Sequence, residues 1–151
     1  MNNQNADSNL LLPILRRIPI FATLDEDLHK EILEHIVLMY YPEKHTLFNE
    51  GEDGDALYII KTGEVQIFRP AKEEDELPKP IAEIAEGGFF GEMALVSEAP
   101  RSASAKTLAE SEIFILSKND FNQLIKNNPN LAEQISSTVI SRLKQNDQNK
   151  K

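Results

Sequence analysis

The sequence predicts a mainly β domain with helices at both ends, and three observations support this fold class. Apolar residues follow a helical period up to about residue 36 and again after residue 117. Between these regions, from about Val37 to Leu116, apolar runs are short and separated by turn residues. The length of 151 residues suffices for one domain with a hydrophobic core. Many short, closely spaced strands favour a barrel or a sandwich over a sheet of βαβ units.

The N-terminal region combines a polar start with an amphipathic helix. Residues 1–9 are polar and are predicted to form a disordered tail. They lack the basic start and apolar run of a secretory signal, and no later stretch approaches the ~20 apolar residues of a membrane helix, so we expect a cytoplasmic location. Thr23 is the predicted N-cap of a helix with an acidic first turn. The apolar stripe of this helix consists of Leu28, Ile32, Leu33 and Ile36.

The middle region divides into strands at its turns. Ala56–Ile60 has the apolar character of a buried strand, and the turn at Lys61–Glu64 leads back into the alternating strand Val65–Phe68. Further strands are predicted at 80–84, 102–107 and 112–116. The polar segment 71–80 contains an acidic run and is predicted to be a solvated hairpin tip.

Two helices are predicted after the strands. Ser117 is the predicted cap of the first, which contains Phe121, Leu124 and Ile125. The second has one apolar stripe, formed by Leu131, Ile135, Val139 and Leu143. No linker interrupts the chain, so residues 10–144 are predicted to form one domain, followed by a polar tail at 145–151.

Composition excludes several function classes. The 16 basic and 25 acidic residues give a net charge of −9, which disfavours nucleic acid or an anionic membrane as the principal partner. The absence of cysteine excludes disulfides and thiolate chemistry. The three histidines, His29, His35 and His45, form no H-x-H pair, and no serine lies in a G-x-S-x-G elbow. We therefore expect no metal site, no cofactor and no enzymatic activity.

The segment from Gly87 to Ala105 is the one that indicates chemistry. Three glycines among its first five residues allow the backbone to approach a ligand closely. Glu92–Val96 favours a short helix whose first N–H groups can face an anion, and Arg101 adds a guanidinium fork suited to phosphate. A carboxylate beside a phosphate is useful if Glu92 accepts a hydrogen bond from a ribose hydroxyl. Together these features indicate a nucleotide.

This segment resembles the phosphate-binding cassette of cyclic nucleotide-binding domains. The resembling stretches are Phe90-Gly91-Glu92-Met93-Ala94-Leu95 and Pro100-Arg101-Ser102-Ala103-Ser104-Ala105. The run from Phe48 to Val65 is similar to the family's F-x-E-G-x-x-G-D-x-L-Y-I-I-x-x-G-x-V pattern, and Ile18–Phe21 is similar to its entry motif. The resemblance covers residues 10–144. It implies a double-stranded β-helix (jelly-roll-like) barrel with N-terminal helices and two C-terminal helices.

The resemblance also implies roles for individual residues. Glu92 would accept the ribose 2′-hydroxyl, and Arg101 would pair with the cyclic phosphate. Backbone donors would come from Gly91, Met93, Ala94 and Ser102, and the purine pocket would be lined by Val65, Ala82 and Ile84. Arg142 lies on the stripe of the final helix, where family members of the channel class cover the purine with an arginine. The alternative is that Arg142 extends to solvent at a frayed helix end.

The function implied by this resemblance is regulatory. The domain would bind a cyclic purine mononucleotide, cAMP in preference to cGMP, and the C-terminal helix would close over it. Ser102 leaves the choice of base open, because its hydroxyl can contact phosphate or a guanine amino group. The alternative is a nucleotide-free structural or protein-interaction domain of the same fold. No helix-turn-helix follows the last predicted helix, so we expect no DNA binding by this chain; in a longer protein the output domain could be a channel, a kinase or a DNA-binding domain.

Overall fold

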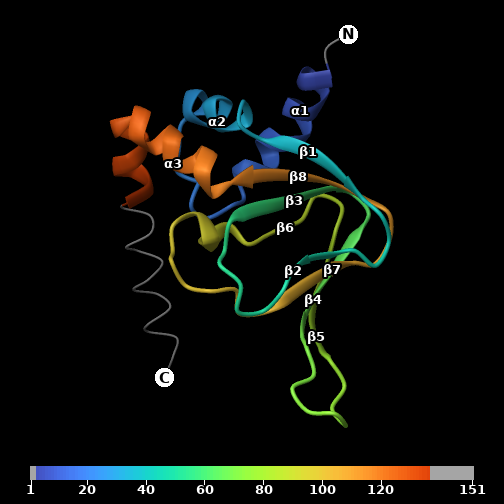
Figure 1. The fold of residues 1–151 in the computed structure, drawn as a ribbon. Helices are drawn as coiled ribbons and strands as arrows, with labels where there is room; N and C mark the ends of the chain where they lie inside the picture. Colours follow the sequence, from blue (N-terminus) through green and yellow to red (C-terminus); the bar gives the residue numbers. More distant parts are fainter. Residues whose placement is uncertain (1–2, 137–151) are drawn as a thin grey trace. The chain divides into compact units, whose positions relative to one another are not determined.

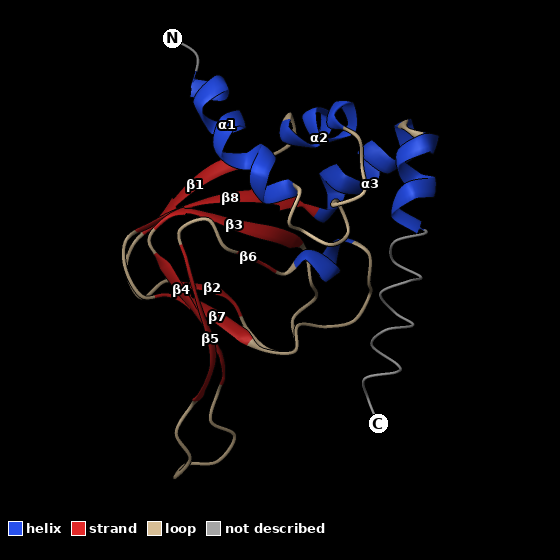
Figure 2. Ribbon diagram, turned by 180° about the vertical axis from the view of Figure 1, so that it is seen from behind, coloured by secondary structure: helices blue, strands red, loops and turns tan. Residues whose placement is uncertain are grey.

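The computed structural model describes residues 3–136, which fall into two compact units (Figure 1). One, the helical unit, comprises the described residues up to His35 and from Asn119 onward. The other, the β unit, comprises Ile36–Lys118. Figure 2 shows the same division by secondary structure, with helices in blue and strands in red. The predicted order of helix, strands and helix along the chain is confirmed.

The helical unit contains α1 (Asn3–Leu15), α2 (Glu26–Leu33), α3 (Lys118–Asn127, whose first residue belongs to the β unit) and a helical stretch at 129–136. α1 begins inside the segment that was predicted to be a disordered tail, so the structure differs from that prediction. Leu11, Ile14 and Leu15 are buried at helical spacing, and this packing extends the helix through Pro13.

The N-cap of α2 is Asp25, two residues after the predicted Thr23. The Asp25 carboxylate accepts a hydrogen bond from the Leu28 N–H at 2.9 Å. Thr23 lies instead in a turn in which the Leu24 N–H donates to the Phe21 carbonyl. The aromatic ring of Phe21 packs against that of Phe121 within the helical unit, with ring centroids 6.0 Å apart.

The β unit consists of two four-stranded antiparallel sheets. One sheet has the order β1-β8-β3-β6 and the other β2-β7-β4-β5. The bounds are β1 Val37–Tyr41, β2 Thr46–Phe48, β3 Ala56–Thr62, β4 Glu64–Arg69, β5 Lys79–Ala85, β6 Phe89–Phe90, β7 Ser104–Thr107 and β8 Ser111–Ser117. The mainly β class is confirmed, and closure of the sheets into the predicted barrel stays a prediction.

Five of these strands, β3, β4, β5, β7 and β8, overlap the ranges predicted from the sequence, whereas β1, β2 and β6 were not predicted individually. β2 and β6 have only three and two residues, too few to show an alternation of apolar and polar residues. β1 is an edge strand with an exposed, uniformly apolar sequence, so it also lacks that alternation. The β4–β5 hairpin extends beyond the sheets (Figures 1 and 2), and its residues 71–80 are exposed, as predicted for a hairpin tip.

The core of the β unit consists of apolar side chains from both sheets. Its fully buried members include Ile60, Val65, Ala105 and Ile113. Among the helices of the described part of the chain, none has the length and apolar character needed to cross a membrane.

The turn between β3 and β4 depends on Gly63. Its φ of +99° lies in the left-handed region, and a Cβ there would lie 2.1 Å from the Ser111 Oγ and 2.7 Å from the Glu110 carbonyl oxygen. Gly51 has a similar φ of +89° but open space around the same position. Side-chain crowding therefore distinguishes two glycines that have the same backbone requirement.

We expect Gly63→Ala to lower the free energy of unfolding by at least about 2 kcal/mol, because it adds steric overlap to the backbone strain. Gly51→Ala should cost only about 1 kcal/mol, the strain alone. Urea unfolding of both variants followed by circular dichroism measures the difference. Equal losses would show that the neighbours of Gly63 move aside.

Candidate functional site

The candidate site lies where two loops of the β unit meet. The loop before β3 and the loop before β7 are joined by backbone hydrogen bonds, in which the Arg101 N–H donates to the Glu52 carbonyl at 2.7 Å and the Gly51 N–H donates to the Arg101 carbonyl at 2.8 Å. An isolated bridge pairs Asp53 with Pro100. The backbone of Arg101 is therefore fixed on both sides before its side chain makes any contact.

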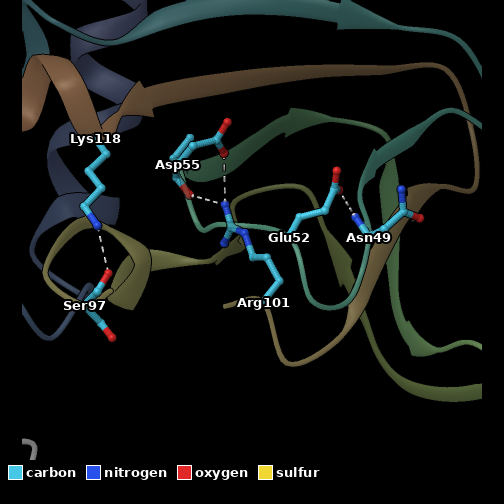
Figure 3. Close-up of polar contacts among 7 residues, drawn as sticks. Asn49, Glu52, Asp55, Ser97, Arg101 and Lys118 are labelled. Carbon is cyan, nitrogen blue, oxygen red and sulfur yellow. Dashed lines mark hydrogen bonds and ion pairs between the residues drawn. The ribbon is translucent and has the colours of Figure 1, made fainter. Parts of the chain in front are cut away.

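The guanidinium of Arg101 is buried, with 8% of the residue exposed. Its Nη2 donates to the Ala56 carbonyl at 3.0 Å and lies 3.4 Å from the Asp55 carboxylate, as the dashed lines of Figure 3 show. The Asp55 side chain is 78% exposed, so solvent screens this ion pair. The Nε of Arg101 is buried without a hydrogen-bond partner. A buried donor without a partner is costly, which indicates a place where a ligand acceptor would be favourable.

Two glycines make room for this side chain and its neighbours. At Gly91, where φ is +81°, a Cβ would lie 2.7 Å from the Arg101 Nη1 and 3.1 Å from the Ala56 carbonyl oxygen. At Gly54, a Cβ would lie 2.7 Å from the Ala94 Cβ. The sequence had predicted a close backbone approach around Gly91 but not at Gly54.

A short 3-10 helix, η1 (Glu92–Leu95), follows Gly91, in agreement with the short helix predicted at Glu92–Val96. The Ala94 N–H donates to the Gly91 carbonyl at 3.1 Å within this turn. If the Ala94 N–H also donated to a bound phosphate, it would have to share its hydrogen between the phosphate and the Gly91 carbonyl, or lose its bond to that carbonyl. The side chain of Glu92 is half-buried, and Leu95 is buried with 2% exposure.

These residues surround a pocket of about 350 Å³, within the range of small-molecule sites. The pocket brings together all six residues predicted to contact phosphate or ribose. Its lining consists of Gly54, Gly91, Glu92, Met93, Ala94, Ser97, Ala99, Pro100, Arg101 and Ser102. The described residues hold no cluster of three or more potential metal ligands.

Lys118 ties the pocket wall to the start of α3. Its Nζ donates to the Ser97 carbonyl at 2.9 Å (Figure 3) and lies 3.2 Å from the Glu98 carboxylate. Its backbone N–H donates to the Asp55 carbonyl at 2.8 Å. Both loops that hold Arg101 thus have a bond to this one residue.

Tyr58, whose ring centroid lies 5.8 Å from the Arg101 Cζ, is affected by the charges of Arg101 and Asp55. The pKa of Tyr58 is raised to about 12, mainly by burial and in part by the Asp55 carboxylate, while the Arg101 cation acts in the opposite direction. Tyr58 therefore stays protonated at neutral pH.

The three residues predicted to line the purine lie on adjacent strands. Val65 is directly opposite Ile84, and Ile67 is directly opposite Ala82, so all four side chains share one face of the sheet. Val65 is fully buried, and Ile84 packs against the same core cluster. None of the three is part of the lining described above. Ile67 was not named from the sequence, although the alternation along β4 places it on the same face.

Arg142, the predicted cover of the base, lies outside the described residues, as do Val139 and Leu143.

Comparison with known proteins assigns the family. The sequence profile of the cyclic nucleotide-binding domain matches residues 38–128. The chain belongs to this family. The matched region contains both loops and every residue of the pocket.

Members of the cyclic nucleotide-binding domain family with regulatory roles are among its relatives. The cyclic AMP receptor protein of Thermus thermophilus is 31% identical over 129 residues, which are 85% of this chain and 59% of that protein. The N-terminal domain of a transcriptional regulator from Streptomyces coelicolor A3(2) superposes with a TM-score of 0.78 at 28% identity, covering 90% of this chain and 94% of that one.

The regulatory domain of the Toxoplasma gondii cAMP-dependent kinase, crystallised with cAMP, has a TM-score of 0.70 at 27% identity, over 81% of this chain and 46% of that one. This chain spans about three fifths of the length of the bacterial curated regulators that it matches and 15–28% of the length of the curated kinase proteins.

Several residues of the site were not assigned a role from the sequence. Phe48, Gly54 and Asp55 belong to the family-like run before β3, but nothing in their spacing places them against a side chain some fifty residues later. Lys118 carries no sequence signal at all, because its contacts are to backbone carbonyls of distant loops and to an exposed carboxylate.

Proposed function

We propose that this domain binds a cyclic purine mononucleotide, cAMP in preference to cGMP, as a regulatory sensor. The observation that supports this most directly is the Arg101 guanidinium, 8% exposed and with a buried, unpartnered Nε, at the wall of a 350 Å³ pocket. A cyclic phosphate would supply the missing acceptor, together with a negative charge additional to that of the exposed Asp55 carboxylate. The names of relatives, a cyclic AMP receptor and a kinase domain crystallised with cAMP, support the choice of adenine.

In the proposed complex each part of the ligand has its own contact. Arg101 pairs with the phosphate, and backbone N–H groups of Gly91, Met93, Ala94 and Ser102 supplement it. Glu92 accepts the ribose 2′-hydroxyl. Val65, Ala82 and Ile84 contact the purine, and Arg142 covers it. We propose a ligand contact, and no catalytic role, for each of these groups.

Sensing requires that the ligand change the population of conformations. We propose that phosphate binding orders η1 around Arg101 and that the C-terminal helix closes over the purine. Leu95 of η1 is already buried, so an inward movement of its side chain is not part of this proposal. We name no protein or domain that receives the signal.

Calorimetric titration with cAMP, cGMP and 5′-AMP tests the function. We expect cAMP to bind more tightly than cGMP and 5′-AMP to bind weakly. Arg101→Ala should weaken cAMP binding by about 3–5 kcal/mol, because it leaves the phosphate charge without its cation. Arg69→Ala, which removes an exposed arginine of β4 outside the pocket, is the matched control and should leave the affinity unchanged. A folded wild-type protein that ignores both cyclic nucleotides at millimolar concentration would leave only the nucleotide-free scaffold.

Glu92→Gln tests the ribose contact. A carboxylate accepts a hydroxyl hydrogen bond more strongly than an amide, so cAMP should bind about tenfold more weakly. The affinity for 2′-deoxy-cAMP should change by less than about twofold, since that ligand lacks the hydroxyl. Glu83→Gln, on exposed β5 outside the pocket, is the control. Equal losses for both ligands would assign Glu92 a different role.

Hydrogen exchange tests the closure. We expect saturating cAMP to increase amide protection between Asn130 and Leu143, and the increase should vanish in Arg101→Ala at the same ligand concentration. Unchanged protection over this segment in a ligand-saturated wild type would reject closure while leaving binding intact.

A further inference from the structure

The guanidinium of Arg101 lies over the face of an aromatic ring. Its Cζ is 4.0 Å from the centroid of Phe48 and 5.8 Å from that of Tyr58. Phe48 belongs to a cluster of three rings, with its centroid 5.7 Å from Tyr58 and 6.1 Å from Phe90. Tyr58 and Phe90 are stacked at 5.1 Å, which holds the cluster rigidly. The platform under the guanidinium is therefore part of the core of the β unit.

The Phe48 ring stabilises the buried positive charge of Arg101, which the polar neighbours stabilise only in part. The guanidinium contacts the Ala56 carbonyl at 3.0 Å and the Asp55 carboxylate at 3.4 Å, and Asp55 is largely in solvent. A guanidinium with 8% exposure loses most of its hydration. The negative face of an aromatic ring attracts a cation, and more strongly where water is excluded.

The direction of this attraction matters for binding. The N–H donors of a guanidinium lie in its plane, whereas the ring acts from above that plane. Phe48 can therefore stabilise the cation without occupying a donor. A carboxylate in the same place would take the donors and would repel a phosphate. The donor at Nε is without a partner, and Nη1 lies beside the backbone of Gly91.

We propose that Phe48 is a positioning residue for ligand binding: its ring fixes the plane of the Arg101 guanidinium so that free N–H donors face the pocket. This inference rests on the proposed function of Arg101 as the phosphate-binding group and adds the residue that preorganises it. The role is specific to the aromatic face, so it is not fulfilled by an aliphatic side chain of similar size.

Four variants test the proposal by calorimetry with cAMP. Phe48→Leu and Phe48→Met keep an apolar side chain without the ring, and we expect each to weaken binding about 3- to 30-fold. Phe48→Tyr keeps the ring and should bind within about twofold of wild type. The matched control is Phe68→Leu, since Phe68 is also half-buried and lies under a cation, the Lys106 Nζ at 5.0 Å, but outside the pocket. Circular dichroism selects a temperature at which each variant is fully folded.

A spectroscopic measurement on the ligand-free protein gives an independent readout. Protons above a ring are shielded, so the Arg101 side-chain resonances in wild type should lie upfield of their positions in Phe48→Leu or Phe48→Met. Phe68→Leu should leave them unmoved. If one aliphatic variant fails to fold, the other serves for both measurements.

The outcomes separate this proposal from the proposed function. If the wild-type protein binds neither cyclic nucleotide, both the proposed function and the positioning role of Phe48 are rejected. Normal wild-type binding with unchanged affinity in the aliphatic variants rejects Phe48 alone. Equal weakening in Phe48→Tyr, or in Phe68→Leu, also rejects it, because the loss would then reflect general packing.

Discussion

A buried cation has to be compensated, and the arrangement of the candidate site follows from the placement of one guanidinium. Arg101 is held by its own backbone bonds to Glu52 and Gly51 before its side chain turns inward. The carbonyl of Ala56 then fixes one nitrogen, and the face of Phe48 supports the plane. What is left is the unpartnered Nε donor, on a residue that lines the pocket together with Gly91 and residues of η1. Such a site favours a compact anion with several acceptor oxygens.

Pocket residues that lie close together in the sequence could be predicted, whereas the contacts from distant segments that hold Arg101 in place could not. Glycines, Glu92 and Arg101 lie within one short segment, so their residue types and spacing identify them without a structure. Phe48, at the end of β2, and Gly54 and Asp55, in the loop before β3, approach the same guanidinium from about fifty residues away in the chain. Contacts of this kind are set by strand pairing, which residue patterns do not encode. The same limit explains β2 and β6, which exist because β7 and β3 offer them hydrogen bonds.

Local signals also failed where two of them competed. The helix that begins at Asn3 contains Pro13, and a proline usually ends a helix. Buried Leu11, Ile14 and Leu15 outweigh that tendency through their packing. Thr23 and Asp25 are both good capping residues, and the turn from Phe21 to Leu24 decides between them, since it leaves the Asp25 carboxylate next to the Leu28 N–H. Packing selected one of two acceptable local solutions in the first case, and a neighbouring turn did so in the second.

The net charge of −9 does not conflict with an anionic ligand. Charges on the surface are screened within about 8–10 Å at physiological salt, whereas a phosphate in the pocket would touch Arg101 directly. Two carboxylates near the pocket have cationic partners: Asp55 pairs with Arg101, and Glu98 pairs with Lys118. Lys118 bonds the Ser97 carbonyl and the Asp55 carbonyl, so both loops around the guanidinium have a bond to the residue at which the chain leaves the β unit. A ligand that moved either loop would therefore have to move Lys118 or break its bonds.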